Sequence, residues 1–556
     1  MLTRIASVAA ALTALPAVAL ACGGLFCDNA QPVNQAAERI LFARDAGKIE
    51  MHVQIAYQGP PANFGWLLPT APDVETTLGS EELFRVLDQD YAPQFQLNFV
   101  LDESCSDLFG SRAGSDASAS AGDDGAGGTA GDGGVQVLSR EALGPYDRTI
   151  LQANSVQDLR NWLDANGYQI PASTDEKLAP YVDAGAAFVA LKMLPGADAG
   201  DVQPLRLVYT AALPAIPITP TGVAANPDMG VLVHVLGQTR AIPKNYRHLQ
   251  INEAALDWTT GGQNYADVVS QAADEAAGRG FVTDFAGPHD NLAAQVAPLS
   301  DLMVDDLAAA QTLDAALQAV GYNLQDADLV RIFTAVVEPP EGISAAQFLS
   351  CPSCFDEQGS PPLDGAALAA RVRDEINPPR ERLATLLGAQ PYLTRLYTTL
   401  SPAEMDLDPE FSFNPDLAGV DRLRTATQIT FCEEQGDDIE QWSVIELSNG
   451  LRFPLDTFGS VPDAIARRDG ESLRGADAPA AAVIEQLGEA GQPTVIEDRT
   501  DALAARYSAN IRTPRGGGGV GGTGDGCGCR ATGTRGGTPW WLALPWLPLA
   551  LRRRRR

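Results

Sequence analysis

The chain has 556 residues and a formal net charge of −32 at pH 7, because 71 acidic residues outnumber 39 lysines and arginines. A surface this acidic repels nucleic acid and anionic lipid headgroups, so the charge excludes the nucleic-acid-binding classes. An apolar fraction of 45% in a chain of this length is enough to bury a substantial core. The composition therefore indicates a globular protein with several domains or one large elaborated domain.

The N-terminal segment 1–21 is typical of a secretory signal. It holds one positive charge at Arg4, an apolar stretch after it, and a small-x-small ending at Ala21. We therefore expect the export machinery to carry the chain out of the cytoplasm and signal peptidase to cut after Ala21. Cys22 would then come first, and lipoprotein processing at Cys22 stays open as an alternative to ordinary cleavage.

Strand patterns dominate the next part of the chain. KIEMHVQIAY, residues 48–57, alternates apolar and polar side chains, and Asp45, Ala46 and Gly47 before it are suited to turning it back on ERILFA as a hairpin. Further strands, partly buried and antiparallel or mixed, are predicted at 94–100, 186–194, 204–211 and 230–236. The run 110–134 has no apolar residue larger than alanine and is predicted to be a disordered acidic insertion.

Helix patterns fill the middle of the chain. Ser155 is suited to cap a helix that ends near Gly167, and further helices are predicted at 301–320, 364–376 and 380–388. A strand pair that turns at Asn449 and Gly450 follows. This order predicts an α+β fold, with mixed or antiparallel strands in the N-terminal half, a helical middle section and a disordered Gly-rich tether near the C-terminus.

Eight cysteines in an exported chain favour disulfides over metal or redox chemistry. Cys527 and Cys529 lie in the Gly-rich segment near the C-terminus, which leaves six cysteines with 15 possible full pairings. We predict the pairs Cys22 with Cys27, Cys351 with Cys354, and Cys105 with Cys432. The last pair would close a long loop, which stabilises the fold on the loop-entropy model.

The strongest catalytic candidate is the Cys-x-x-Cys formed by Cys351 and Cys354, because thiol-disulfide enzymes use this spacing. Such enzymes activate the first thiol at the start of a helix. Here a short helix is expected before Cys351 and Gly-Ser-Pro-Pro follows at 359–362, so both thiols fall in a loop. A structural disulfide is therefore favoured over redox chemistry and over zinc, which would need a second Cys or His pair.

The four histidines form no catalytic motif. His52 is predicted on the polar face of its strand, His234 inside an apolar strand run, and His248 and His289 in loops. The sequence contains no nucleophile elbow, His-Glu-x-x-His motif or phosphate-binding loop. The acidic run 406–411 could ligate calcium but lacks the EF-hand order, and a glycosidase-type carboxylate pair stays open because its spacing is spatial. We therefore assign no catalytic, cofactor-binding or metal-binding residue.

The C-terminal segment 530–556 combines an apolar stretch at 540–551 with five arginines at 552–556. As a helix the apolar stretch would span about 18 Å, too little for a bilayer core of about 30 Å. Together with GGGGVGGTGDGCGC before it, the segment resembles the C-terminal sorting signal of myxobacterial proteins that myxosortases process. The resemblance implies that a sorting protease of the membrane removes the tail and that Cys527 or Cys529 carries a surface lipid. A simple tail anchor is the alternative.

A second resemblance covers residues 22–432. FGWLLPTAP from Phe64, LGPYDRTIL from Leu143, DANGYQIP from Asp164 and, most specifically, PYLTRLYTTLSPAEMDLDPEF at 391–411 are similar to domain-of-unknown-function family 2330 of exported bacterial proteins. The resemblance implies no activity or catalytic residue. We expect a signal peptide at 1–21, a main family domain at 22–432, an α+β extension at 433–511, a Gly-rich tether at 512–529 and a sorting tail at 530–556.

Three functions are consistent with these features. We favour an exported, surface-attached protein with a non-catalytic binding or envelope-structural role. A secreted hydrolase acting on extracellular polymer is the first alternative, and a thiol-disulfide protein that uses Cys351 and Cys354 is the second. A concave pocket that gathers polar groups would bear on the choice between the first two.

Overall fold

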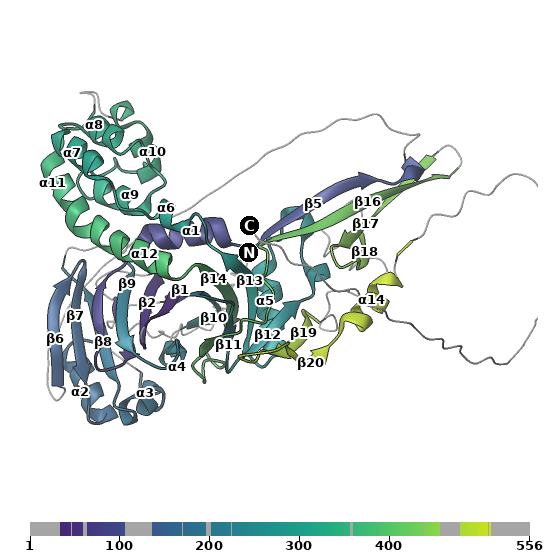
Figure 1. Cartoon of the computed structure of the whole chain (residues 1–556), viewed down its shortest axis with the longest axis horizontal. Helices are drawn as coiled ribbons and strands as arrows, with labels where there is room; N and C mark the ends of the chain where they lie inside the picture. The colour runs from purple at the N-terminus through teal and green to yellow at the C-terminus, as the bar shows by residue number, and fades with distance from the viewer. Residues whose placement is uncertain are drawn as a thin grey trace, which may run out of the picture. The chain divides into compact units, whose positions relative to one another are not determined.

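The structure, a computed structural model, describes residues 34–45, 47–58, 64–105, 136–168, 171–195, 202–223, 225–355, 360–435, 438–455, 479–509 and 511–512 (Figure 1). The predicted signal, acidic insertion and sorting tail lie outside these ranges. So do five residues assigned to processing, attachment or disulfides, which are Ala21, Cys22, Cys27, Cys527 and Cys529. Within the described ranges, none of the helices has the length and apolar content that a membrane span requires.

Ten strands from distant parts of the chain form one mixed sheet (Figure 1). In order across the sheet they are β20 (Thr494–Asp498), β19 (Ala481–Gln486), β12 (Arg247–Ile251), β13 (Gly280–Pro288), β14 (Tyr392–Leu400), β10 (Ala225–Gly237), β1 (Asn34–Asp45), β2 (Lys48–Gln58), β9 (Leu205–Thr210) and β4 (Glu75–Leu78). β1 pairs in parallel with β10, and β12 with β13, whereas the other neighbours are antiparallel. The α+β class with mixed strands is confirmed.

The predicted hairpin of β1 and β2 is confirmed, because the two strands pair antiparallel along their whole length. Successive side chains of a strand point to opposite faces of a sheet. Ile40 and Phe42 therefore join the core on one face, together with Met51 and Val53 of β2, while Leu41 joins a second core. That second core also takes in the apolar side of α1 (Glu81–Tyr91), so both faces of the central strands are buried.

A second, four-stranded sheet has the order β3 (Gly65–Thr70), β8 (Ala187–Met193), β7 (Tyr146–Gln152) and β6 (Gln136–Leu143). Helices α2 (Val156–Ala165) and α3 (Thr174–Asp183) pack on it through a core around Trp162. The Ser155 hydroxyl accepts a hydrogen bond of 3.1 Å from the backbone N–H of Asp158. Gly167 adopts a φ of 73°, so both predicted ends of this helix are confirmed.

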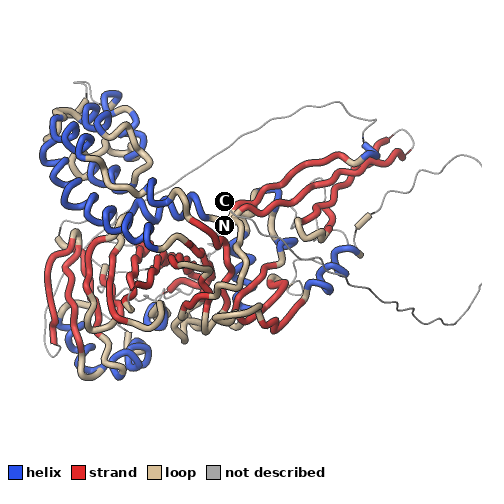
Figure 2. The backbone as a smooth tube through the Cα atoms, in the orientation of Figure 1, coloured by secondary structure: helices blue, strands red, loops and turns tan. Residues whose placement is uncertain are grey.

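Short helices form the middle section, as Figure 2 shows. They are α7 (Asp301–Ala309), α8 (Leu313–Ala319), α9 (Ala327–Thr334), α10 (Ala345–Ser350), α11 (Gly365–Arg371), a π-helical turn (Val372–Ile376) and α12 (Asn377–Ala389). The prediction of one helix at 301–320 is wrong. The chain is extended at Ala310, and the N–H of Leu313 donates to the Pro361 carbonyl over 2.8 Å. A contact with a remote segment thus interrupts a continuous helical pattern.

One buried arginine joins this helical section to α1. The guanidinium of Arg380, 1% exposed, donates to Asp326 over 2.8 and 2.5 Å and to Asp328 over 3.1 and 2.7 Å. Asp328 also accepts from the Ser80 hydroxyl over 2.7 Å and from the N–H of Glu81 over 2.9 Å. These contacts connect α9, α12 and the start of α1.

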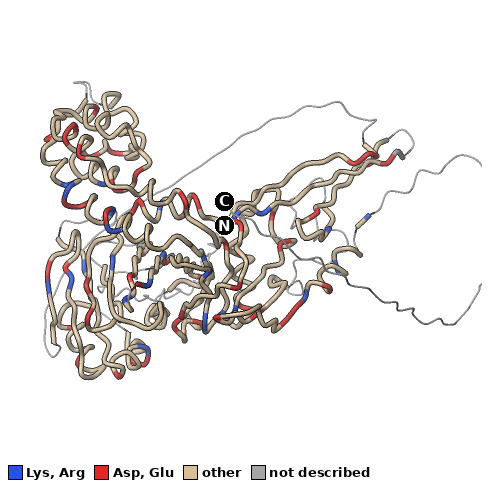
Figure 3. The backbone as a smooth tube through the Cα atoms, in the orientation of Figure 1, with Lys and Arg blue, Asp and Glu red and all other residues tan. Residues whose placement is uncertain are grey.

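A third sheet has the order β18 (Arg452–Leu455), β17 (Asp438–Leu447), β16 (Leu423–Gln435) and β5 (Gln94–Leu101), with β5 parallel to β16. A disulfide joins Cys105 to Cys432 of β16, with Cα atoms 5.0 Å apart. Figure 3 shows acidic residues gathered near the ends of β5 and β16, where the chain carries Asp102, Glu103 and Glu433. The disulfide therefore fixes the residues after β5 to β16 at this end of the sheet.

The remaining elements are β11 (Ala241–Pro243), β15 (Phe411–Phe413), α4 (Ile218–Thr221), α5 (Tyr265–Glu275), α6 (Leu292–Gln295) and α14 (Thr500–Ser508). The predicted strand pair around Gly450 is present as β17 and β18, and Gly450 has a φ of 83°. Cys432, the last residue of the expected family domain, lies inside β16. Strands β19 and β20, which fall in the expected extension at 433–511, belong to the ten-stranded sheet.

Candidate functional site

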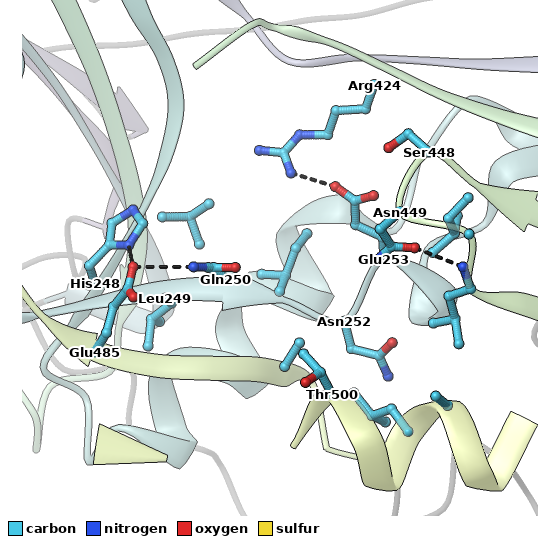
Figure 4. Close-up of a pocket in the computed structure, with 18 of the residues that line it drawn as sticks. His248, Leu249, Gln250, Asn252, Glu253, Arg424, Ser448, Asn449, Glu485 and Thr500 are labelled. Atoms are coloured by element: carbon cyan, nitrogen blue, oxygen red, sulfur yellow. Dashed lines mark hydrogen bonds and ion pairs between the residues drawn. The ribbon is translucent and has the colours of Figure 1, made fainter. Parts of the chain in front are cut away.

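A pocket of about 1100 Å³ lies beside β12 (Figure 4). Its walls come from β12 and the turn after it, β13, the segment 417–424, the β17–β18 turn, β19 and α14. The lining includes fifteen polar or charged residues, Arg240, His248, Gln250, Asn252, Glu253, Thr283, Arg424, Ser448, Asn449, Arg452, Glu485, Gln492, Thr500, Asp501 and Ser508. Segments hundreds of residues apart in sequence therefore bring polar groups of both charges to one cavity.

The alternation of β12 places its polar side chains. The strand reads RHLQI, so His248 and Gln250 share one face, while Leu249 and Ile251 point to the other. Leu249 and Ile251 enter an apolar core with Val268 and other residues of α5. The apolar side chains on one face anchor the strand in this core, and the polar side chains on the other face join the hydrogen-bond network described next.

His248 lies at the centre of a buried hydrogen-bonded row. It faces Glu485 across the β12–β19 pair, with 2.8 Å between Nδ1 and Oε1, and its Nε2 lies 3.0 Å from the Thr283 hydroxyl. Burial lowers the pKa of His248, although the hydrogen bond to Glu485 opposes the shift. Burial alone would raise the pKa of Glu485, but the His248 hydrogen bond holds it below its ordinary value. A neutral His248 with its proton on Nδ1 therefore donates to a carboxylate, and its Nε2 accepts from Thr283.

Arg240 completes this end of the pocket. Its Nη1 donates to the Ala418 carbonyl over 2.9 Å, and its Nη2 donates to the Thr283 hydroxyl over 3.2 Å. Its Nε is buried and has no hydrogen-bond partner among the described residues. Burial lowers the pKa of this arginine. The row Glu485, His248, Thr283, Arg240 thus ends in a guanidinium whose buried Nε donor has no partner among the described residues.

A bulge in β13 aims Thr283 at His248. The pairing of β13 with β14 shifts between Thr283 and Phe285, so Asp284 is an extra residue in the strand. Asp284 is fully buried, accepts from the Tyr265 hydroxyl, and accepts from Arg395 Nε over 3.2 Å. Bulges re-aim side chains and are enriched beside functional sites. Thr283, before the bulge, lines the pocket, whereas Asp284, in the bulge, bonds to Tyr265 and Arg395, which do not line it.

The opposite side of the pocket carries an ion pair, as Figure 4 shows. Arg424 Nη1 donates to Glu253 over 2.7 Å, and its Nη2 donates to the Thr283 carbonyl over 3.4 Å. Burial would lower the pKa of Arg424, but Tyr265 and Glu253 raise it above its ordinary value. Asn449 and Ser448 of the β17–β18 turn lie on the same side. A bound molecule would therefore meet donors and acceptors at both ends.

The described residues offer no group of three or more His, Cys, Asp or Glu side chains placed to hold a metal ion. The pocket is instead built from carboxylates paired with basic groups and from neutral amides and hydroxyls. Such an arrangement suits two kinds of chemistry. It can bind a polar organic molecule, and the row from Glu485 to Thr283 can polarise a hydroxyl group.

The four assigned cysteines that the structure describes do not line this pocket. Cys105 is bonded to Cys432, and Cys351 to Cys354 with Cα atoms 5.4 Å apart. Cys354 ends a short 3₁₀ turn that follows α10, so the pair does not stand at the N-terminus of a longer helix.

One of the four histidine predictions is wrong. His248 was expected in a loop but belongs to β12, because a five-residue strand with one charged end has a weak pattern. His52 shares its face of β2 with Glu50 and Gln54, as predicted, and it is 1% exposed there, with its Nε2 3.0 Å from Glu50. His234 is buried in β10 and His289 lies in a loop, as predicted. Arg240, Thr283 and Glu485 carried no sequence signal, because each belongs to a different strand or turn.

The acidic run 406–411 has structural partners. Asp408 accepts from the Tyr181 hydroxyl over 2.8 Å and from the N–H and hydroxyl of Thr219 over 3.1 and 2.9 Å. Asp406 accepts from Arg279 over 2.8 Å. These two carboxylates are engaged with protein donors, which leaves little reason to invoke calcium there.

Comparisons with known proteins add a family. A family model described as an uncharacterized protein conserved in bacteria, DUF2330, matches residues 16–319. The match is shorter than the predicted range 22–432 and leaves out 391–411, although β14, within that segment, lies between β13 and β10 in the main sheet. No curated protein and no solved structure matches the chain.

Proposed function

The chain belongs to the DUF2330 family of uncharacterized proteins conserved in bacteria, and from that premise we propose that it is an exported, surface-attached protein that binds a polar organic ligand in the pocket beside β12. The single observation that supports binding is the convergence of Arg240, His248, Glu253, Arg424 and Glu485 on one cavity of about 1100 Å³. Cavities that hold small ligands measure about 300–1,000 Å³ and carry a few convergent polar groups.

Paired charges define the kind of ligand. Arg424 is neutralised by Glu253, and the charge of Glu485, which accepts from neutral His248, is balanced by Arg240 in the same row, so neither sign of charge dominates. A neutral or zwitterionic molecule with donors and acceptors at both ends, such as a short peptide or an oligosaccharide, fits this lining better than a simple ion.

The binding proposal can be tested on the full exported chain by thermal unfolding with two probes, dialanine and chitobiose. Gln250→Trp places a bulky ring in the pocket from β12, and Val495→Trp introduces the same side chain at an exposed site on β20 outside it. We expect one probe to raise the melting temperature of the wild type and of Val495→Trp but not of Gln250→Trp. The same response in all three proteins, or no response in the wild type, would refute the proposal.

Export and attachment are proposed from the terminal segments, which the sequence alone describes. Mass spectrometry of the cell-surface protein should find a mature start at Cys22 and an end near Cys527 or Cys529. Recovery of peptides from 540–556 in the surface form would overturn this part.

A hydrolase is the second candidate, and the order Glu485, His248, Thr283 is the observation that favours it. In such a reaction Thr283 Oγ1 would attack a substrate carbonyl while its proton passes to His248 Nε2. His248 would then protonate the leaving group as the bond to it breaks, and water would release the acyl group as an acid and restore Thr283.

The hydrolase can be tested with p-nitrophenyl acetate as an ester probe. Turnover that falls at least 100-fold in both Thr283→Val and His248→Asn would support it. Turnover that is absent from the wild type, or equal in the variants, would exclude it and leave binding alone.

A further inference from the structure

Two neighbouring cavities away from the pocket share one arginine. The first, of about 460 Å³, lies between β2, β9 and α12, and the second, of about 680 Å³, lies against the β6–β7 turn and the helices α9, α11 and α12. Arg382 of α12 lines both. Their walls are partly apolar, with Val208 and Leu386 in the first and Leu78 and Pro145 in the second.

Two half-buried carboxylates that line these cavities already have partners. Glu50 accepts from Arg206 over 2.6 and 2.7 Å and lies 3.0 Å from His52. Glu375 accepts from Arg371 over 2.7 and 3.0 Å and from Arg331 over 3.1 Å. The other two acidic lining residues, Asp45 and Asp374, are exposed to solvent.

Arg382 stands apart from these pairs. It is half-buried, and its buried Nε has no hydrogen-bond partner among the described residues. Burial lowers the pKa of Arg382 and the charge of Arg206 lowers it further, whereas Glu50 and Glu381 act in the opposite direction. The chain has 71 acidic residues, yet none of the described ones is bonded to Arg382. Partial removal of this charge from water lowers the stability of the fold unless a bound anion pairs with it.

We propose that the two cavities form a second ligand site, which takes an organic anion whose carboxylate, phosphate or sulfate rests on Arg382. A guanidinium binds such groups through two parallel N–H···O bonds, which a lysine does not match. The organic part of the ligand lies against the apolar walls on either side of Arg382. This site is independent of the pocket beside β12, because none of its lining residues is shared with that pocket.

The test uses calorimetry on the full exported chain with glucuronate, glucose 6-phosphate, glucose and inorganic phosphate. We expect glucuronate or glucose 6-phosphate to bind at least tenfold more tightly than glucose and inorganic phosphate. Arg382→Gln should weaken that binding at least tenfold. Arg373→Gln, which changes an exposed arginine bonded to Asp305, should leave it unchanged. Which of the two anions binds tells a carboxylate ligand from a phosphate ligand.

Three results would overturn the proposal: neither organic anion binds, inorganic phosphate binds as tightly as the organic anions, or Arg382→Gln binds as the wild type does. A second measurement does not depend on the probe. Arg382→Met keeps the aliphatic stem but removes the unpaired charge, so it should raise the melting temperature in buffer without anions. A lower melting temperature would mean that Arg382 serves the fold and not a ligand.

Discussion

His248 and Glu485 face each other on β12 and β19, with 2.8 Å between Nδ1 and Oε1, although 237 residues separate them in sequence. Glu485→Gln keeps the shape but removes the charge that the imidazole N–H meets. We expect a loss of about 1–3 kcal/mol in the free energy of unfolding, because a buried donor loses its charged acceptor. Urea unfolding at pH 7.5 measures this. A change below 0.5 kcal/mol, roughly the effect of an ordinary surface substitution, would show that the pair contributes little.

The same histidine should make stability depend on pH. Its pKa is lowered in the folded protein, so the unfolded chain binds more protons below its unfolded value of about 6.5. The stabilisation by neutral His248 is therefore complete above about pH 6.5 and declines as the pH falls toward the folded pKa. His248→Asn keeps a donor for Glu485 but does not titrate, so its stability should fall less between pH 7 and pH 5. Equal losses in the two proteins would contradict this.

Glu38 should act in the opposite direction. It is buried among apolar residues of β1, β2 and β10, and its Oε2 has no hydrogen-bond partner among the described residues. Burial raises its pKa to about 7. Folding is therefore penalised as the pH rises from about 4.5 to about 7, and the full penalty is about 3 kcal/mol above that range. Glu38→Gln should be about 3 kcal/mol more stable than the wild type at pH 8 and no more stable at pH 4.5. Denaturant unfolding at the two pH values checks both halves.

Arg380 offers a test of a buried ion cluster. Replacement by alanine leaves Asp326 and Asp328 buried without their cation, which typically costs about 3–5 kcal/mol. Arg373→Ala removes an exposed ion pair with Asp305 and should cost less than about 1 kcal/mol. Thermal unfolding of the two variants side by side gives the comparison, and equal losses would mean that the cluster is not what joins α1 to the helical section.

The two described disulfides should differ in their effect on stability. The Cys105–Cys432 bond has a sequence separation of 327 residues, and on the loop-entropy model its removal by a double serine substitution costs about 6 kcal/mol. The Cys351–Cys354 bond has a separation of only 3 residues, so its removal should change stability far less. Unfolding of both double variants under non-reducing conditions decides this. A larger loss from the Cys351–Cys354 variant would refute the ranking.

Local patterns in the sequence were sufficient for elements whose contacts are near in the chain. The alternation of 48–57 and the turn before it predicted the β1–β2 hairpin, and Ser155 with Gly167 predicted both ends of α2. In each case the residues that set the geometry lie within a few positions of one another. The same reasoning failed at 301–320, because the break between α7 and α8 depends on hydrogen bonds to the segment around Pro361.

Only the tertiary structure could reveal the pocket beside β12. Arg240, Thr283 and Glu485 have no spacing that a motif could report, since the order of strands in the ten-stranded sheet brings them together. The same holds for Arg382, which is notable only for the partner it lacks once α12 packs beside β2 and β9. Strand order across hundreds of residues is decided by the packing of the whole core, whereas periodicity reports only which side of each element is buried.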